Sequence, residues 1–195
     1  MNLRTACREG RLDIVNKMIS GGVKAWNWGL CGACQGGHLE IINLMISKGA
    51  RDWDTGLGKA CQGGHPEVVN LMISKGSTAY NWGLREACQG GHLEVVNLLI
   101  SKGATYWDLG LRGACQGGHL DLINLMISKG ANDWKWLKGI SSLSLCERGL
   151  QLSFLQKFDE KLYKDIVSFR KNIVVCCSGL LLPDLSRVVS SYSLI

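Results

Sequence analysis

The sequence predicts an all-α fold in which short helix-turn-helix repeats stack into a solenoid, closed by a helical cap at its C-terminal end. A small pair, Ala-Cys, recurs at intervals of 27 residues, at Ala6, Ala33, Ala60, Ala87 and Ala114. From the second copy to the fifth, the surrounding residues are nearly identical, and each copy holds two helical stretches separated by Gly-Gly-His. A repeat of this length buries its apolar side only against its neighbours, so we expect an extended binding surface rather than one concentrated site.

Composition limits the class of protein. Of the 195 residues 46% are hydrophobic, which is enough for a packed core, and the net charge of +6 comes without any run of lysine or arginine. We therefore expect no nucleic-acid partner, and we expect the protein to be a monomer. No apolar run is long enough to cross a bilayer and the N-terminal residues have no signal core, so we expect no membrane association. Nine cysteines without an export signal indicate reduced thiols and a cytoplasmic location.

The second helical stretch of each repeat has the clearer pattern. In residues 93–102, Glu94, Asn97 and Ser101 form one narrow polar stripe and apolar residues cover the rest of the circumference, as suits a helix inside a stack. Pro66 begins this stretch in the third repeat, which fits the first position of a helix. The first stretch, about residues 84–89, is predicted to be only two turns long, with its Ala-Cys pair buried.

Several sequence patterns resemble metal-binding or catalytic motifs, but each of them is incomplete here. Zinc ligands lie about 2 Å from a shared ion, whereas equivalent atoms of neighbouring helices lie about 10 Å apart. The four repeated histidines are therefore predicted to cap turns: His38, His65, His92 and His119. Cys31 and Cys34 have Cys-x-x-Cys spacing but no second pair, and Asp52-Trp53-Asp54-Thr55 lacks the strand that an aspartate phosphotransferase motif requires. We predict no catalytic residue, no cofactor and no metal.

The phrase Gly-Leu-x-x-Ala-Cys-x-Gly-Gly-His-Leu-Glu-Val-Val-Asn-Leu-Leu-Ile-Ser-Lys-Gly-Ala resembles the ankyrin repeat. The resemblance implies an ankyrin-like α-solenoid that binds a protein partner and is not an enzyme. The unit is 27 residues here, against about 33 in the family. The shortfall lies where the family forms its β-turn finger, so the loops are expected to be shortened. Such abbreviated repeats are similar to those of large DNA viruses that infect amoebae, which would place the protein in the host cytoplasm.

Candidate partner-binding residues come from an aromatic ladder and from variable positions. One aromatic residue per repeat stands where the finger would be, and a second slot two residues later holds Trp28, Trp82 and Trp136. These rings either cover the loop edge or serve as exposed anchors, since Trp and Tyr are frequent in binding hot spots. Positions that differ between copied repeats, before Ala-Cys and in the loops, are predicted to be exposed. The candidates are Trp26, Trp53, Tyr80, Arg85, Tyr106, Trp107, Arg112 and Trp134.

The repeat register blurs after Trp136. We expect five repeats over residues 1–136, a degenerate capping repeat over 137–160 and a helical tail over 161–195. In the tail, the pattern that begins at Leu182 is similar to F-box-like helices that bind the adaptor of cullin ubiquitin ligases. An alternative function is therefore a substrate adaptor for a ubiquitin ligase, while a plain cap helix is the simpler interpretation. The candidate docking residues are Leu182, Pro183, Leu185, Val188 and Val189.

Overall fold

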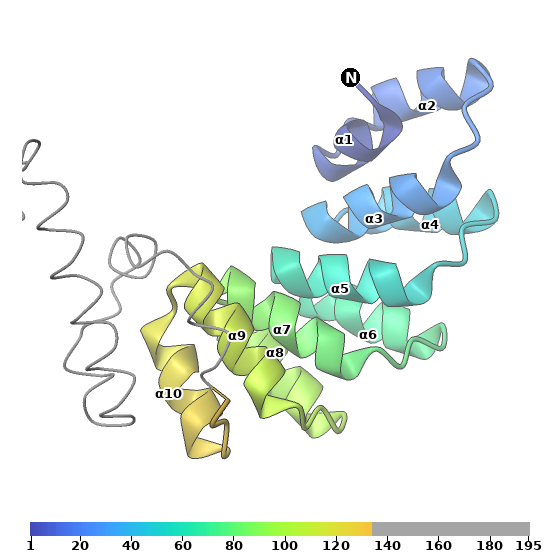
Figure 1. Ribbon diagram of the computed structural model, residues 1–195. Helices are drawn as coiled ribbons and strands as arrows, with labels where there is room; N and C mark the ends of the chain where they lie inside the picture. Colours follow the sequence, from blue (N-terminus) through green and yellow to red (C-terminus); the bar gives the residue numbers. More distant parts are fainter. Residues whose placement is uncertain (134–195) are drawn as a thin grey trace, which may run out of the picture. The chain divides into compact units, whose positions relative to one another are not determined.

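The computed structural model describes residues 1–133, which form ten helices and no strand (Figure 1). Consecutive helices pair into five helix-turn-helix repeats that stack side by side, as the predicted all-α solenoid requires. The helices are α1 (Leu3–Arg8), α2 (Leu12–Ser20), α3 (Trp26–Gly36), α4 (Leu39–Ser47), α5 (Trp53–Gly63), α6 (Pro66–Ser74), α7 (Tyr80–Gly90), α8 (Leu93–Ser101), α9 (Trp107–Gly117) and α10 (Leu120–Ser128). None of these helices is long and apolar enough to span a membrane.

Some predictions fall on the remainder of the chain. The expected capping repeat and helical tail lie outside the described residues. So does Trp134, the last of the aromatic candidates, and so do the five candidate docking residues: Leu182, Pro183, Leu185, Val188 and Val189.

The first helices of repeats 2 to 5 are longer than the sequence predicts. Two turns were expected for residues 84–89, whereas α7 and its equivalents each contain 11 residues. The added turn begins at the aromatic residue of the ladder and contains Asn or Asp and Gly, which are poor helix formers. Packing requires that glycine, since a Cβ on Gly56 would lie 2.8 Å from Met72 Sδ. The loop is therefore short, as expected, and the ladder begins a helix instead of lining the loop.

Columns of equivalent residues form the core. Each of the longer first helices has a buried leucine directly before the two variable positions that precede Ala-Cys, at Leu30, Leu57, Leu84 and Leu111, and every Ala-Cys pair is buried as predicted. The second helices add Ile42, Met45 and their equivalents. Small residues in the first helix allow the second helix to pack closely, so stability comes from contacts between short helices that could not persist alone.

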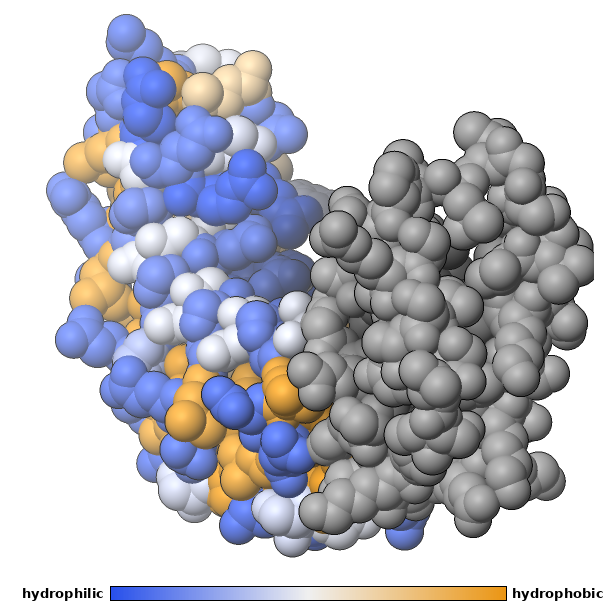
Figure 2. Space-filling model, turned by 90° about the vertical axis from the view of Figure 1, so that its left-hand side faces the viewer, coloured by the Kyte–Doolittle hydropathy of each residue, from blue (hydrophilic) through white to orange (hydrophobic). Residues whose placement is uncertain are grey.

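The Gly-Gly-His turns lie along one edge of the stack and the longer loops along the other (Figure 1). Figure 2 shows the turn edge, where hydrophilic and near-neutral residues form bands, while hydrophobic residues gather at the height of the last repeats. The second glycine of each turn ends the helix in the left-handed conformation, as at Gly64 with φ 78°. A Cβ on the equivalent Gly37 would also lie 2.6 Å from the ring of His65. Both the backbone conformation and the lack of space therefore require glycine at this position.

Each histidine of these turns connects two repeats. His65 Nε2 lies 3.1 Å from the backbone carbonyl of Gln35, near the end of the previous first helix. Because a carbonyl oxygen can only accept, Nε2 carries the proton and donates. The same contact, at 3.0–3.2 Å, recurs at His38, His92 and His119. The histidine side chains make no capping bond at the start of their own second helices, so the predicted role is corrected: each caps a carbonyl of the preceding first helix.

Candidate partner-binding face

The second helices cover one side of the first helices, and the opposite side carries four positions per repeat. These positions follow helical spacing, as in Trp82, Arg85, Glu86 and Gln89 of α7, so they share one face. We call the whole surface the first-helix face. Its members are Met1, Arg4, Thr5 and Arg8; Trp28, Cys31, Gly32 and Gln35; Thr55, Gly58, Lys59 and Gln62; Trp82, Arg85, Glu86 and Gln89; Leu109, Arg112, Gly113 and Gln116.

Successive first helices meet in contacts that we call joints, and in two joints the residue directly before Ala-Cys must be glycine. A Cβ on Gly32 of α3 would overlap the carbonyl oxygen of Arg4 in α1. A Cβ on Gly113 of α9 would likewise overlap the carbonyl oxygen of Arg85 in α7. In the α3/α5 and α5/α7 joints the equivalent residues are Lys59 and Glu86, which place a half-buried and a buried side chain there.

The predicted exposure of the variable pair before Ala-Cys is wrong for most of its members. These positions face the joints, where the neighbouring first helix covers them. Those that are buried are Cys31, Gly32, Gly58, Glu86 and Gly113. Lys59 and Arg85 are half-buried, and only Arg112 is exposed among the four complete repeats. In the loops, by contrast, Arg51, Thr78, Thr105 and Tyr106 are exposed as predicted.

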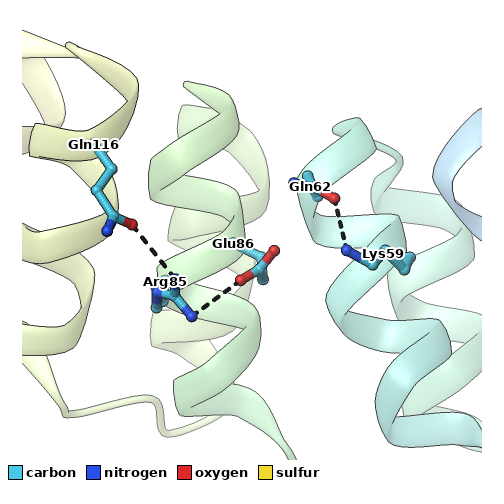
Figure 3. A network of polar contacts seen from close by, with 5 residues as sticks. All are labelled: Lys59, Gln62, Arg85, Glu86 and Gln116. Carbon is cyan, nitrogen blue, oxygen red and sulfur yellow. Dashed lines mark hydrogen bonds and ion pairs between the residues drawn. The ribbon is translucent and has the colours of Figure 1, made fainter. Parts of the chain in front are cut away.

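Polar side chains form a network at the centre of the face (Figure 3). Arg85 Nη1 lies 3.5 Å from Glu86 Oε1, and Arg85 Nη2 donates to Gln116 Oε1 of the next repeat at 3.4 Å. On α5, Lys59 Nζ donates to Gln62 Oε1 at 2.9 Å. Glu86 is only 5% exposed, so its carboxylate depends on the arginine beside it. Arg85 therefore supports the array itself, which the sequence did not suggest.

The two aromatic slots differ in exposure. The residues that begin the first helices, Trp26, Trp53, Tyr80 and Trp107, are all half-buried. In the second slot, Trp28 is 62% exposed, and the Arg4 guanidinium lies 5.6 Å from its ring centroid. Trp82 occupies the same slot but rests on Gly58, where a Cβ would lie 2.7 Å from the ring. The most exposed ring on the face is thus Trp28, which is not among the predicted binding residues.

Two predicted residues near α9 are open to a partner. Tyr106, the last loop residue before α9, is 64% exposed. Arg112 is exposed, and within residues 1–133 no contact holds its guanidinium. Tyr106, Arg112 and Trp28 are therefore large side chains that the first helices and the adjoining loops present to solvent.

The residue after each ladder aromatic has a structural role that the sequence analysis missed. Asn81 Oδ1 accepts from the backbone N–H groups of Thr105 at 2.8 Å and Tyr106 at 3.0 Å, which fixes the next loop. Asn27, Asp54 and Asp108 make the same kind of contact with the loops that follow their repeats. Recurrence of Asn or Asp after the aromatic every 27 residues was the signal that could have revealed it.

The same contacts account for the aspartates that resemble a phosphotransferase motif. Asp52 is the N-cap of α5, where its carboxylate accepts from Thr55 N at 3.2 Å. Asp54 accepts from the Ser77 hydroxyl at 2.7 Å and from Thr78 N at 3.2 Å. Both carboxylates therefore hold the backbone of the array in place.

The six cysteines in residues 1–133 are free and buried. Burial raises the pKa of Cys7 to about 11 and the pKa of Cys88 and Cys115 to about 12. For Cys31, burial and then the Asp52 carboxylate raise the pKa. Such thiols are poor nucleophiles, because the thiolate is the reactive form. Within these residues no group of three or more His, Cys, Asp or Glu side chains could hold a metal ion.

Comparison with known proteins gives one match. Residues 30–109 match the family model described as ankyrin repeats, in three copies. These residues run from the buried leucine of α3 into α9 and include four of the five residues of Figure 3, Lys59, Gln62, Arg85 and Glu86. No curated protein matches the chain.

Proposed function

We propose that this protein binds another protein through the first-helix face and the adjoining loops, because residues 30–109 match the ankyrin repeat family, whose members generally mediate protein–protein interaction. The exposure of Trp28, Tyr106 and Arg112 carries this proposal. Trp, Tyr and Arg are the residue types that dominate binding hot spots. Their exposure is informative because most other large side chains of the first helices are half-buried or buried.

The charge of the face indicates the kind of partner. Its cations are Arg4, Arg8, Lys59, Arg85 and Arg112, and its only carboxylate, Glu86, is buried beside Arg85. A partner that offers carboxylates and an apolar anchor would complement both the cations and the exposed ring of Trp28. The cations are spread over the repeats instead of forming a run, which favours a protein over a nucleic acid.

A pair of substitutions tests the proposal. Partners are first collected by proximity labelling in cells that express the chain, and the strongest is purified. We expect Tyr106→Ala combined with Arg112→Ala to weaken its binding at least about tenfold without lowering the melting temperature, since neither side chain supports the fold. The matched control is Lys102→Ala with Lys129→Ala, which alters exposed residues away from the face. Equal binding by both double variants would refute the assignment of the face.

The finer features of the proposal rest on the sequence. The expectation of a non-enzymatic, cytoplasmic and monomeric module is part of this proposal and comes from the sequence. The ligase-adaptor alternative depends on the F-box-like pattern at Leu182 and Pro183. Its test is binding of the whole chain to a purified cullin adaptor. Loss of that binding in Leu182→Ala with Pro183→Ala would support it, and no binding by the unaltered chain would refute it.

A further inference from the structure

The first residues of the second helices form a row along the turn edge, which is the edge that Figure 2 shows. In repeats 2 to 5 each second helix begins with an apolar residue that an acidic residue follows. We call these eight residues the turn strip: Leu39 and Glu40, Pro66 and Glu67, Leu93 and Glu94, Leu120 and Asp121.

The leucines of the turn strip are open to solvent. Leu93 is 50% exposed, and Leu39 and Leu120 are each 39% exposed. The fold does not require leucine there, because the first position of a helix also accepts proline, as at Pro66. Exposed apolar groups beside charged residues are typical of interaction surfaces. The row of leucines is therefore apolar surface that the packing of the repeats leaves uncovered.

The carboxylates of the turn strip have no cation of their own. Repeat 1 shows the alternative, since Arg11 precedes its second helix and lies 3.7 Å from the carboxylate of Asp13. In repeats 2 to 5 a histidine stands in place of Arg11 and donates to the preceding first helix. Within residues 1–133, no ion pair or hydrogen bond holds the side chains of the four acidic residues. The start of a helix favours their negative charge, but each carboxylate remains open to a cation.

The surroundings of the strip contain no positive residue. From the cysteine of Ala-Cys to the serine that ends the second helix, each of repeats 2 to 5 has one acidic residue and no lysine or arginine. The chain as a whole has a net charge of +6. The turn strip is thus an anionic and partly apolar line on a basic protein. A complementary partner carries cations next to apolar side chains.

The spacing of the repeats indicates the shape of that partner. Neighbouring repeats place equivalent atoms about 10 Å apart. An α-helix rises about 1.5 Å per residue, so a side chain returns to the same side after seven residues and about 10 Å. In an extended strand the return comes after about 7 Å, which does not match the repeats. We propose that the turn strip binds an amphipathic helix of another protein that presents one apolar residue and one Lys or Arg in every seven.

A designed peptide tests this proposal separately from the proposed function, because the first-helix face is a different surface. The peptide is labelled, end-blocked and about 21 residues long, and it repeats Leu-Ala-Gln-Ala-Arg-Ala-Gln. Titrated with the full chain, it should bind saturably by fluorescence anisotropy. Replacing every Arg by Glu, or every Leu by Gln, should weaken binding at least about tenfold, since each change removes one of the two recognised groups. A peptide with one Ala of each heptad replaced by Pro should bind as weakly, because proline breaks the helix.

Variants of the chain locate the binding. The first variant neutralises the strip by Glu40→Gln, Glu67→Gln, Glu94→Gln and Asp121→Asn, and it should bind the peptide at least about tenfold more weakly. The matched control adds the same charge at the other end of the same helices, where the serines are exposed: Ser47→Lys, Ser74→Lys, Ser101→Lys and Ser128→Lys. This control should bind the peptide as the unaltered chain does. Thermal melts check that both variants fold, and the peptide variants decide the question if the first does not.

Four results would overturn the proposal. The first is no binding of the designed peptide by the unaltered chain. The second is equal weakening in the neutralised variant and its control, since net charge alone would then explain the effect. The third is equal binding of the proline peptide, because the occupant would not be a helix. The fourth is self-association of the chain that the neutralised variant abolishes and the peptide does not displace, since the occupant would then be a second copy.

Discussion

The two kinds of joint show how one position can alter a nearly uniform array. In the α1/α3 and α7/α9 joints, the outer joints of residues 1–133, Gly32 and Gly113 let the backbones touch at this position. In the α3/α5 and α5/α7 joints, the inner joints, Lys59 and Glu86 stand at the same position and place charged side chains between the helices. Residues elsewhere in these repeats are almost identical. The residue that directly precedes each Ala-Cys pair therefore sets how closely the two helices of a joint approach at that position and how polar the joint is.

The side-chain contacts on the face do not follow the two kinds of joint. Arg85 is held by Glu86 of its own helix and, across the α7/α9 joint, by Gln116. Across the α1/α3 joint, the Arg4 guanidinium lies over the ring of Trp28. Arg112 has no such contact within residues 1–133, so its guanidinium and the exposed ring of Trp28 are groups that a partner could use.

The largest expected effect comes from breaking an outer joint. Gly113→Ala adds a Cβ that overlaps the Arg85 carbonyl, which is backbone and cannot rotate away. Alanine gains about 1 kcal/mol of helix propensity over glycine, but overpacking costs about 1–3 kcal/mol and the separation of α7 and α9 adds lost contacts. We expect a net loss of about 2 kcal/mol in the free energy of unfolding, measured by urea denaturation.

The matched variant for this prediction is Lys59→Ala in an inner joint. That position already carries a Cβ, so the joint has room for alanine and the free energy of unfolding should change by about 0.5 kcal/mol or less. If Gly113→Ala proved as stable as the unaltered chain, close backbone contact would not be what distinguishes the outer joints.

A smaller effect is expected from Arg85→Ala, which leaves the buried Glu86 without its cation. The side chain of Arg85 is 29% exposed, so the cost should be moderate, about 1–2 kcal/mol. Arg112→Ala, at the same position of the next repeat, should cost about 0.5 kcal/mol or less because nothing depends on it. Adding Glu86→Gln to Arg85→Ala should restore part of the loss. Equal melting of the two arginine variants would show that the network contributes nothing.

The difference between Arg85 and Arg112 shows where sequence reasoning reached its limit. Periodicity was sufficient to predict the stacked helical pairs, the buried Ala-Cys pairs and the helix start at Pro66. It did not show that the variable positions face a neighbouring helix, because a single repeat contains no information on how closely the next one packs. The first turn of α7 and its equivalents was missed for a related reason, since local propensity is poor there and tertiary packing supplies the stability.

Both kinds of joint contain a histidine cap, so removing the cap should lower the free energy of unfolding equally in both. His92 caps across the inner α5/α7 joint and His119 across the outer α7/α9 joint, at 3.1 and 3.2 Å from their carbonyl acceptors. Each alanine variant should lose one hydrogen bond, worth about 1 kcal/mol. Arg11 has the same position in repeat 1 and is exposed, so Arg11→Ala serves as the control. A cost for His119→Ala far above that of His92→Ala would show that the cap depends on joint spacing.

The smallest expected effect is on the reaction rates of the buried thiols, and it should differ between an inner and an outer joint. Burial raises the pKa of Cys61 and of Cys115, and for Cys61 the nearby Glu86 carboxylate raises it further. Both should react slowly with iodoacetamide at pH 8 and faster as pH rises, because the thiolate is the nucleophile. Glu86→Gln removes the second cause at Cys61 alone. Peptide-level mass spectrometry should therefore show a modest acceleration at Cys61, less than about tenfold because burial remains, and none at Cys115. Equal acceleration at both thiols would mean that the substitution loosens the whole array, and the inner joint would then have no electrostatic character of its own.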